Sequence, residues 1–287
     1  MKKFLLILSL LVIAWSGFSQ SLLWKISGKD LKSPCYFYGT AHIQDQRVFA
    51  FDSTVLNALT SCDAFAMEVL MDQLDVNAVQ TSLYMPKGKT LSGMMSKEDF
   101  ALLDSLCKAK LGASAIFFNT MKPFFLSSAL EQMDMAQDME EALDLFFLRN
   151  AREAQKTCYG LEEYMDQINA IDAFSEKDQL EMLLSYIKDT DHSTDEFDSL
   201  LISYLAFDLD GMLSMTSDEN YPKKFKKVLV DNRNVTMANE FEKIAKERTV
   251  FAAVGAAHLA GKKGVLALLK KKGYTVEPVP FNWIPEN

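Results

Sequence analysis

The sequence lacks the short motifs that mark several large enzyme classes. It contains no HExxH, no P-loop, no GxSxG and no GxGxxG followed by a helix. Hydride transfer, nucleotide hydrolysis and α/β-hydrolase chemistry therefore lose support. Cysteine is scarce as well: none of the four cysteines has CxxC or CxxH spacing, and this disfavours a zinc-thiolate site.

Acidic residues outnumber basic residues in the chain. Thirty lysines and arginines stand against thirty-nine aspartates and glutamates, which gives a net charge of −9. The chain therefore has no electrostatic footprint for nucleic acid or for anionic lipid. Its 49% hydrophobic and 24% charged residues are those of an ordinary globular chain, which excludes a disordered, collagenous or multi-spanning protein.

Beyond the N-terminus, no apolar run approaches the roughly 18 to 20 residues of a membrane span. The first twenty residues consist of Met-Lys-Lys, an apolar run from Phe4 to Trp15, and small or polar residues up to Gln20. This pattern predicts a signal peptide over residues 1–19 that is cleaved near Ser19; an uncleaved anchor is the alternative. No cysteine stands at the cleavage point, so we expect a periplasmic or secreted protein without a lipid or transmembrane anchor in its mature form.

An exported chain can form disulfides. Cys35 and Cys62 each precede a strand-like run, so the sequence predicts that they lie at the same end of a sheet. The alternative is that Cys35, Cys62, Cys107 and Cys158 are buried thiols that pack as small hydrophobic groups.

Apolar periodicity predicts one domain over residues 20–287. A strand, a helix and a strand follow one another between residues 36 and 70, which predicts a parallel pair. We expect an α/β fold with a mainly parallel central sheet flanked by helices. Its sheet-forming ends are 20–75 and 231–287, and the mostly helical middle, 76–230, forms a lid or second layer. The expected strands are 22–26, 36–38, 64–70, 157–162, 249–254 and 274–279; the expected helices are 52–59, 96–110, 123–139, 140–155, 176–188, 197–213, 233–247 and 264–272.

One pattern occurs at both ends of the chain: an apolar strand followed by Gly-x-x-His, at Gly39 to His42 and at Gly255 to His258. A single copy is ordinary turn chemistry. Two equivalent copies, in a chain with three histidines, point to function. The glycines are expected to let the chain leave each strand sharply and to keep the site uncrowded. His192 lies in the acidic segment 189–196, which is predicted to be a solvated loop.

Ligands bind outside the carboxyl ends of parallel strands. Four side chains are expected there: His42, Glu68, Glu162 and His258. Two imidazoles with one or two carboxylates suit a divalent metal with open positions.

Several polar residues have alternative interpretations. Glu68 interrupts an apolar run, so it needs a metal or an arginine as partner if it is buried. Glu162 either joins the site or caps the next helix. Arg233 and Asn234 begin a helix, which suits anion recognition or plain capping. Asp144 either orients a histidine or lies on the surface.

The abundant methionines indicate core filling more than a groove for apolar peptides.

The residues that carry these patterns resemble the TraB/GumN (TraB/PrgY/GumN) family, which includes the Tiki metalloproteases. The matching segments are Tyr38–His42, the isolated Glu68, Gly160–Glu162, Arg233–Asn234 and Val254–Leu259. The resemblance implies that the two Gly-x-x-His motifs and Glu68 form the active site. In the Tiki branch it implies peptide-bond hydrolysis dependent on a divalent metal such as manganese or cobalt. Related branches include macrolide-lactone esterases and haem-binding proteins.

These observations predict an exported metal-dependent hydrolase, specifically a peptidase with a peptide or protein substrate. His42, Glu68 and His258 are expected to hold manganese or cobalt, with zinc as an alternative. Glu162 is expected to be a ligand or general base. Arg233 and Asn234 are expected to bind substrate, and Arg233 also to hold the developing oxyanion. The alternative is a non-catalytic protein that binds haem, a metal or a peptide in the same crevice. The sequence does not indicate the oligomeric state.

Overall fold

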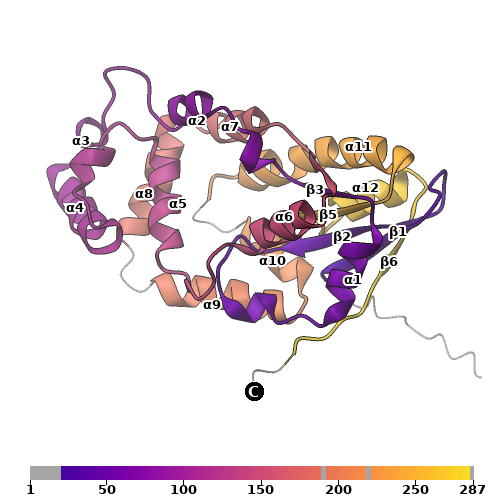
Figure 1. Ribbon diagram of the computed structural model, residues 1–287. Coiled ribbons are helices and arrows are strands. Elements are labelled where there is room, and N and C mark those ends of the chain that lie inside the picture. The colour runs from indigo at the N-terminus through magenta and orange to yellow at the C-terminus, as the bar shows by residue number, and fades with distance from the viewer. Residues whose placement is uncertain (1–20, 189–191, 218–220, 285–287) are drawn as a thin grey trace, which may run out of the picture.

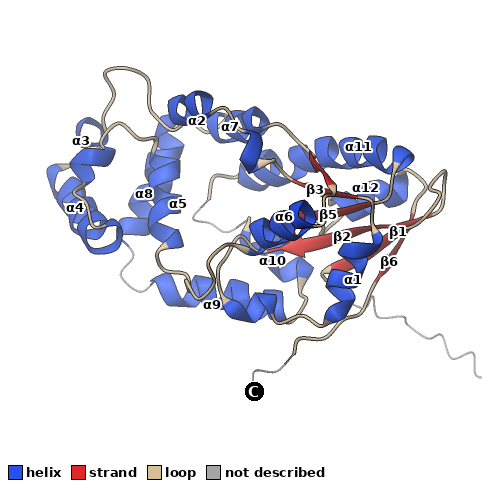
Figure 2. Cartoon of the chain, in the orientation of Figure 1, coloured by secondary structure: helices blue, strands red, loops and turns tan. Residues whose placement is uncertain are grey.

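A computed structural model describes residues 21–188, 192–217 and 221–284. The predicted signal peptide, 1–19, lies outside the described residues. Figures 1 and 2 show a sheet covered by helices, with a helical lobe beside it that contains α3, α4, α5 and α8. The helices are α1 (Ser53–Ser61), α2 (Val76–Ser82), α3 (Leu91–Met94), α4 (Lys97–Leu111), α5 (Pro123–Gln132), α6 (Leu143–Glu153), α7 (Tyr164–Asp172), α8 (Glu176–Lys188), α9 (His192–Leu205), α10 (Leu209–Met215), α11 (Asn232–Glu247) and α12 (Val265–Lys271).

The six expected strands form a single sheet in the order β4-β3-β5-β2-β1-β6. The strands are β1 (Leu23–Ser27), β2 (Cys35–Thr40), β3 (Ala64–Met67), β4 (Thr157–Gly160), β5 (Val250–Gly255) and β6 (Thr275–Pro278). The pairs β4-β3, β3-β5 and β5-β2 are parallel, whereas β1 pairs antiparallel with both β2 and β6. The sheet is therefore mixed. The four strands β4, β3, β5 and β2, called the parallel half below, carry the strand ends at which the site was expected.

Helices cover both faces of the parallel half. Successive side chains of a strand point to opposite faces, and β2 illustrates this: the Phe37 ring packs on Phe241 of α11 at 4.5 Å between centroids, whereas the Tyr38 ring packs on Phe147 of α6 at 5.1 Å. Burial of one such ring stabilises the fold by about 1.5–3 kcal/mol. Because both faces are covered, β3 is apolar and buried along its whole length, as is typical of a parallel strand.

The helical lobe has an apolar cluster of its own, in which Leu103, Leu126 and Leu183 have no exposed surface. These residues belong to α4, α5 and α8, so the helical middle packs partly on itself beside the sheet (Figure 1). Within the residues that the structure describes, no helix is both long enough and apolar enough to cross a membrane. All four cysteines are buried and free.

Two predicted helices and one predicted loop differ from the structure. Helix α5 ends at Gln132, and the following segment runs beside the chain after His42, where Met139 donates its backbone N–H to the Gln44 carbonyl at 2.9 Å. The segment 197–213 is broken where Phe207 adopts a left-handed φ of 59° and Asp208 caps α10. Residues 192–196 of the predicted loop belong to α9, while 189–191 lie outside the described residues.

Candidate functional site

Four parallel strands end at one edge of the sheet, and polar side chains follow each of them. His42 comes two residues after β2, Glu68 directly after β3, Glu162 two residues after β4, and His258 three residues after β5. Because parallel strands share their direction, these chain segments meet at a single edge. The structure brings together all four side chains that the sequence placed there.

Glu68 is at the centre of the site. Its Oε1 accepts a 2.8 Å hydrogen bond from the Gly255 backbone N–H and lies 3.8 Å from the Nε2 atoms of both His42 and His258. Its Oε2 accepts a 2.6 Å hydrogen bond from Arg233 Nη2. Burial acts to raise the pKa of Glu68, but the two histidines and the guanidinium hold it well below its ordinary value. Glu68 is therefore an ionised carboxylate inside the protein.

Arg233 joins Glu68 to Glu162. Its Nε lies 3.1 and 3.0 Å from the two oxygens of Glu162, its Nη2 contacts both carboxylates, and its Nη1 donates to the Leu229 carbonyl at 2.9 Å. The side chain of Glu162 has no exposed surface. Its pKa is raised because burial outweighs the opposing charge of Arg233. Glu162 is thus a buried carboxylate paired with Arg233, and Arg233 lies between Glu162 and Glu68.

Gln167 belongs to the site although the sequence analysis did not identify it. Its Nε2 donates to Glu162 Oε1 at 2.9 Å and approaches Glu68 Oε2 at 3.3 Å. Gln167 lies on α7, whose N-terminus is capped reciprocally by Glu163 and Asp166. Since Glu163 caps the helix, Glu162 is free to face the site. The signal available in the sequence was the position of Gln167, five residues after Glu162 and just after the cap of α7.

His42 is the exposed member of the histidine pair, with 57% of its side chain accessible. Its Nδ1 lies 3.2 Å from Asp144 Oδ2. Of the two alternatives for Asp144, a contact with a histidine or a position on the surface, the structure shows the contact. Desolvation acts to lower the pKa of His42, but Asp144 and Glu68 together raise it well above its ordinary value. Asp144 Oδ1 is buried and has no hydrogen-bond partner among the described residues.

His258 is the buried member of the pair. Its Nδ1 lies 2.6 Å from Asn234 Oδ1. Burial lowers the pKa of His258 to about 4; Glu68 opposes the shift, while Arg233 and His42 add to it. His258 is therefore neutral at neutral pH. Asn234 has no exposed surface, so it holds His258 and does not face a substrate as was expected.

The two motif glycines differ in what they make room for. A Cβ on Gly255 would lie 3.2 Å from Glu68 Oε1 and 3.5 Å from His42 Nε2, so this glycine keeps the site open. A Cβ on Gly39 would lie 3.1 Å from the Ala256 Cα, inside packed protein. The φ of Gly255 is −51°, and neither glycine has a positive φ. The expectation that these glycines allow a sharp turn is therefore wrong. Glycine is required at both positions because neighbouring atoms lie too close for a Cβ atom.

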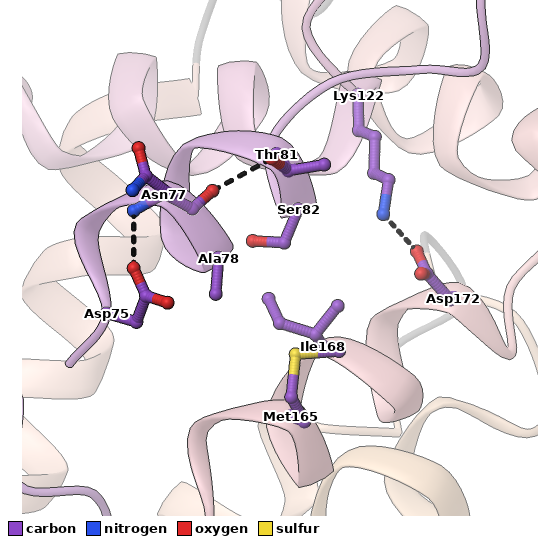
Figure 3. Close-up of a pocket in the computed structure, with 9 residues that line it drawn as sticks. All are labelled: Asp75, Asn77, Ala78, Thr81, Ser82, Lys122, Met165, Ile168 and Asp172. Carbon is purple, nitrogen blue, oxygen red and sulfur yellow. Dashed lines mark hydrogen bonds and ion pairs between the residues drawn. The ribbon is translucent and has the colours of Figure 1, made fainter.

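A separate hollow of about 520 Å³ lies between α2 and α7 (Figure 3). Its lining residues are Asp75, Asn77, Ala78, Thr81, Ser82, Lys122, Met165, Ile168 and Asp172. Figure 3 shows Ile168 and Met165 facing Ala78 across the hollow, with the Lys122–Asp172 ion pair at one side. None of the residues around Glu68 lines it.

The donor atoms around Glu68 are of the types that bind divalent metal ions. Histidines that bind a metal through one nitrogen generally hold an oxygen with the other, and the Nδ1 atoms of His42 and His258 are occupied in this way by Asp144 and Asn234. Two donors about 2.1 Å from one ion lie about 3.4 Å apart at the tetrahedral angle, close to the 3.8 Å from each Nε2 to Glu68 Oε1. Within the described part of the chain, no group of three or more His, Cys, Asp or Glu side chains is already arranged to hold an ion.

The chain matches the sequence model of the TraB/PrgY/gumN family over residues 22–278. It is also similar to a protein from Amphimedon queenslandica named Metalloprotease TIKI homolog, with 22% identity over 331 aligned residues. The alignment covers 93% of this chain and 64% of that relative, so the chain spans less than two thirds of the relative's length. No solved structure matches the chain significantly.

Proposed function

Because this chain belongs to the TraB/PrgY/gumN family, we propose that it is a hydrolase that uses a divalent metal ion to cleave peptide bonds. One observation carries the proposal: two imidazoles approach the same oxygen of Glu68 through Nε2, while the Nδ1 of each is held by an oxygen. A buried carboxylate between two such rings is suited to a cation. The name of the similar protein, Metalloprotease TIKI homolog, supports peptides as the substrate class.

His42, Glu68 and His258 are the proposed ligands, for manganese or cobalt with zinc as an alternative. A bound ion of this kind lowers the pKa of a water molecule and polarises a carbonyl group. Because a histidine binds a metal only in its neutral form, His42 would release a proton when the ion binds. The ligand set would then be two neutral nitrogens and one carboxylate, which leaves positions for water and substrate. Removal of any one ligand is expected to weaken metal binding.

The remaining residues hold this set in place. Arg233 pairs with Glu68 and keeps it ionised, and Glu162 with Gln167 holds Arg233 from the buried side. Asp144 holds His42, whose exposed side chain marks the open side of the site. We propose that the substrate approaches from the His42 side, because Glu162 and Asn234 have no surface that a substrate could touch.

The location of the reaction also belongs to the proposal. The predicted leader would export the chain to the periplasm or the medium, where its substrates would be peptides or proteins. N-terminal sequencing of the purified mature protein tests this, with a start near Gln20 as the expected result.

The activity is tested by measuring metal content and cleavage together. The mature chain is purified without chelator, analysed for metals, and incubated with a peptide library in the presence of manganese, cobalt or zinc. We expect about one metal per chain and metal-stimulated cleavage, both lost in His258→Ala. His192→Ala is the matched control, since it removes the remaining histidine, on α9, and should change neither readout.

The opposite result would favour the binding-protein alternative. A chain that carries no metal and cleaves no peptide under any addition overturns the proposal. A haem absorption band that appears on titration and is lost in His42→Ala or His258→Ala would then identify the crevice as a haem site.

A further inference from the structure

Asn234 is a buried amide with both ends occupied. Its Oδ1 lies 2.6 Å from His258 Nδ1, and its Nδ2 donates to the Lys263 backbone carbonyl at 3.0 Å. The residue has no exposed surface, so water cannot replace either partner. Each of the two bonds therefore constrains the other.

The protonation of the imidazole follows from this arrangement. A backbone carbonyl oxygen can only accept a hydrogen bond, so the NH₂ group of Asn234 must face Lys263. The amide oxygen must then face His258, and since that oxygen also only accepts, the proton has to be on Nδ1. A neutral His258 consequently has a lone pair on Nε2, the atom that lies 3.8 Å from Glu68 Oε1.

We propose that Asn234 is the positioning residue of the site, which fixes His258 in the tautomer with Nδ1 protonated and directs the Nε2 lone pair towards Glu68. The consequence for a metal ion rests on the proposed function. The assignment of the tautomer does not, because it follows from hydrogen bonds within the chain.

The Lys263 carbonyl that accepts from Asn234 belongs to a loop that is itself held by ion pairs. The side chain of Lys263 donates to Asp231 Oδ2 at 3.1 Å, and Lys226 Nζ lies 2.6 Å from Asp231 Oδ1. Asp231 ends the π-helical turn Lys227–Asp231 that leads directly into α11, a type of turn often found at functional sites. This contact ties the loop that carries the Lys263 carbonyl to the helix that carries Asn234.

Two consecutive residues at the start of α11 thus hold the carboxylates and the buried histidine of the site. Arg233 holds the carboxylates Glu68 and Glu162, and the next residue, Asn234, holds the imidazole of His258. His42 has a carboxylate, Asp144, in the corresponding place. The amide brings no charge into a buried position beside Glu68, where a second unpaired carboxylate would be costly.

The first test uses the wild-type chain without metal. Long-range ¹H–¹⁵N NMR of the ¹⁵N-histidine-labelled, chelator-treated protein near neutral pH distinguishes a protonated from an unprotonated ring nitrogen. The sequence has three histidines, so His42→Ala and His192→Ala identify the signals of His258. We expect protonated Nδ1 and unprotonated Nε2. A proton on Nε2 alone, or a mixture of tautomers, would overturn the proposal.

The second test uses variants of Asn234. Asn234→Ala should give a mixture of tautomers and lower the affinity for Co²⁺ by about 10–100-fold, the usual effect of removing such a partner. Asn234→Asp keeps an acceptor oxygen for Nδ1 but loses the donor to the Lys263 carbonyl and adds a carboxylate beside Glu68, so it should keep the proton on Nδ1 and lower the stability to urea. Asn239→Ala, at an exposed asparagine of the same helix, is the matched control and should change neither readout. Unchanged tautomer and affinity in Asn234→Ala would contradict the proposal.

The two proposals can fail separately. If the wild-type chain binds no Co²⁺ or Mn²⁺, the proposed function fails, while the wild-type NMR experiment still decides the role of Asn234. If Asn234→Ala does not fold, the wild-type spectrum remains the deciding measurement.

Discussion

The backbone N–H of Gly255 donates a 2.8 Å hydrogen bond to the Oε1 atom of Glu68, a residue 187 positions away in the sequence. Gly255 ends β5 and Glu68 follows β3, the strand beside it in the sheet. The same oxygen lies 3.8 Å from each of the two histidines. The close approach of backbone and carboxylate therefore sets the position of the oxygen on which the proposed metal site depends.

Gly255→Ala should impair the site more than the fold. The added methyl group would lie 3.2 Å from Glu68 Oε1 and 3.5 Å from His42 Nε2, so the carboxylate has to shift. The backbone is compatible with alanine because φ is −51°. We expect Co²⁺ affinity to fall by about 10-fold or more, as measured by calorimetry, with a small change in the midpoint of urea unfolding.

Gly39→Ala is the matched comparison, and we expect the reverse outcome. Its methyl group would lie 3.1 Å from the Cα of Ala256, and overpacking of this kind costs about 1–3 kcal/mol in the free energy of unfolding. Metal affinity per folded molecule should change less than in Gly255→Ala. Equal effects of both variants on affinity and stability would contradict this assignment.

Arg233→Ala should strongly destabilise the chain. It would leave Glu68 and Glu162 buried without their shared cation, and removing one partner of a buried ion pair costs about 3–5 kcal/mol. Urea unfolding followed by circular dichroism measures this cost. Arg152→Ala breaks the exposed pair with Asp72, whose side chains are 38% and 43% accessible, and should cost no more than about 1 kcal/mol. A comparable loss of stability in both variants would show that the buried ion pairs of Arg233 contribute no more to the free energy of unfolding than an exposed ion pair does.

The four cysteines should be unreactive in the folded protein. All are buried and free, and burial raises the pKa of Cys62 to about 12 and that of Cys107 to about 11. Because the thiolate is the reactive species, a thiol reagent should label the chain only after denaturation and should then find four thiols. Fewer than four under non-reducing conditions would reveal a disulfide in the native protein.

Glu242 should contribute to stability in a pH-dependent way. Hydrogen bonds from Lys272 and Lys29 lower its pKa from 4.5 to about 2, against a small opposing effect of burial. Its folded pKa is lower than its unfolded pKa, so the stabilisation is present above about pH 4.5 and is lost as the pH falls towards about 2.

The variant Glu242→Gln measures this contribution. Urea unfolding at several pH values should show a deficit of about 1 kcal/mol near neutral pH, after allowance for solvent screening, and the deficit should shrink in acid. Glu240→Gln on the same helix, which removes the more exposed pair with Lys243, is the control. A deficit for Glu242→Gln that is independent of pH would contradict the electrostatic explanation.

Much of the sheet could be predicted because its strands are uniform. The runs at β3 and β5 are apolar at almost every position, as strands covered on both faces must be. The pairing of β6 with β1 could not be predicted in the same way. The two strands lie at opposite ends of the chain, and no local pattern records which strand β6 joins.

Helix boundaries were harder to predict where tertiary contacts override periodicity. The apolar spacing over 197–213 continues through Phe207, yet this residue is left-handed and α10 begins anew at Leu209. At α5, the chain leaves the helix after Gln132 and runs beside the segment that follows His42. Neither change has a proline or glycine to mark it in the sequence.

The sequence by itself determined which chemical groups reach the edge of the sheet. Apolar strands and the Gly-x-x-His pattern are local properties, so they place His42, Glu68, Glu162 and His258 at strand ends without knowledge of any partner. Only the tertiary structure decided what each polar atom holds. Arg233 reaches a carboxylate 165 positions away, and Asn234 turns inward to His258. The physical reason is that a buried polar atom takes whichever partner packing brings within about 3 Å, and packing is a property of the whole chain.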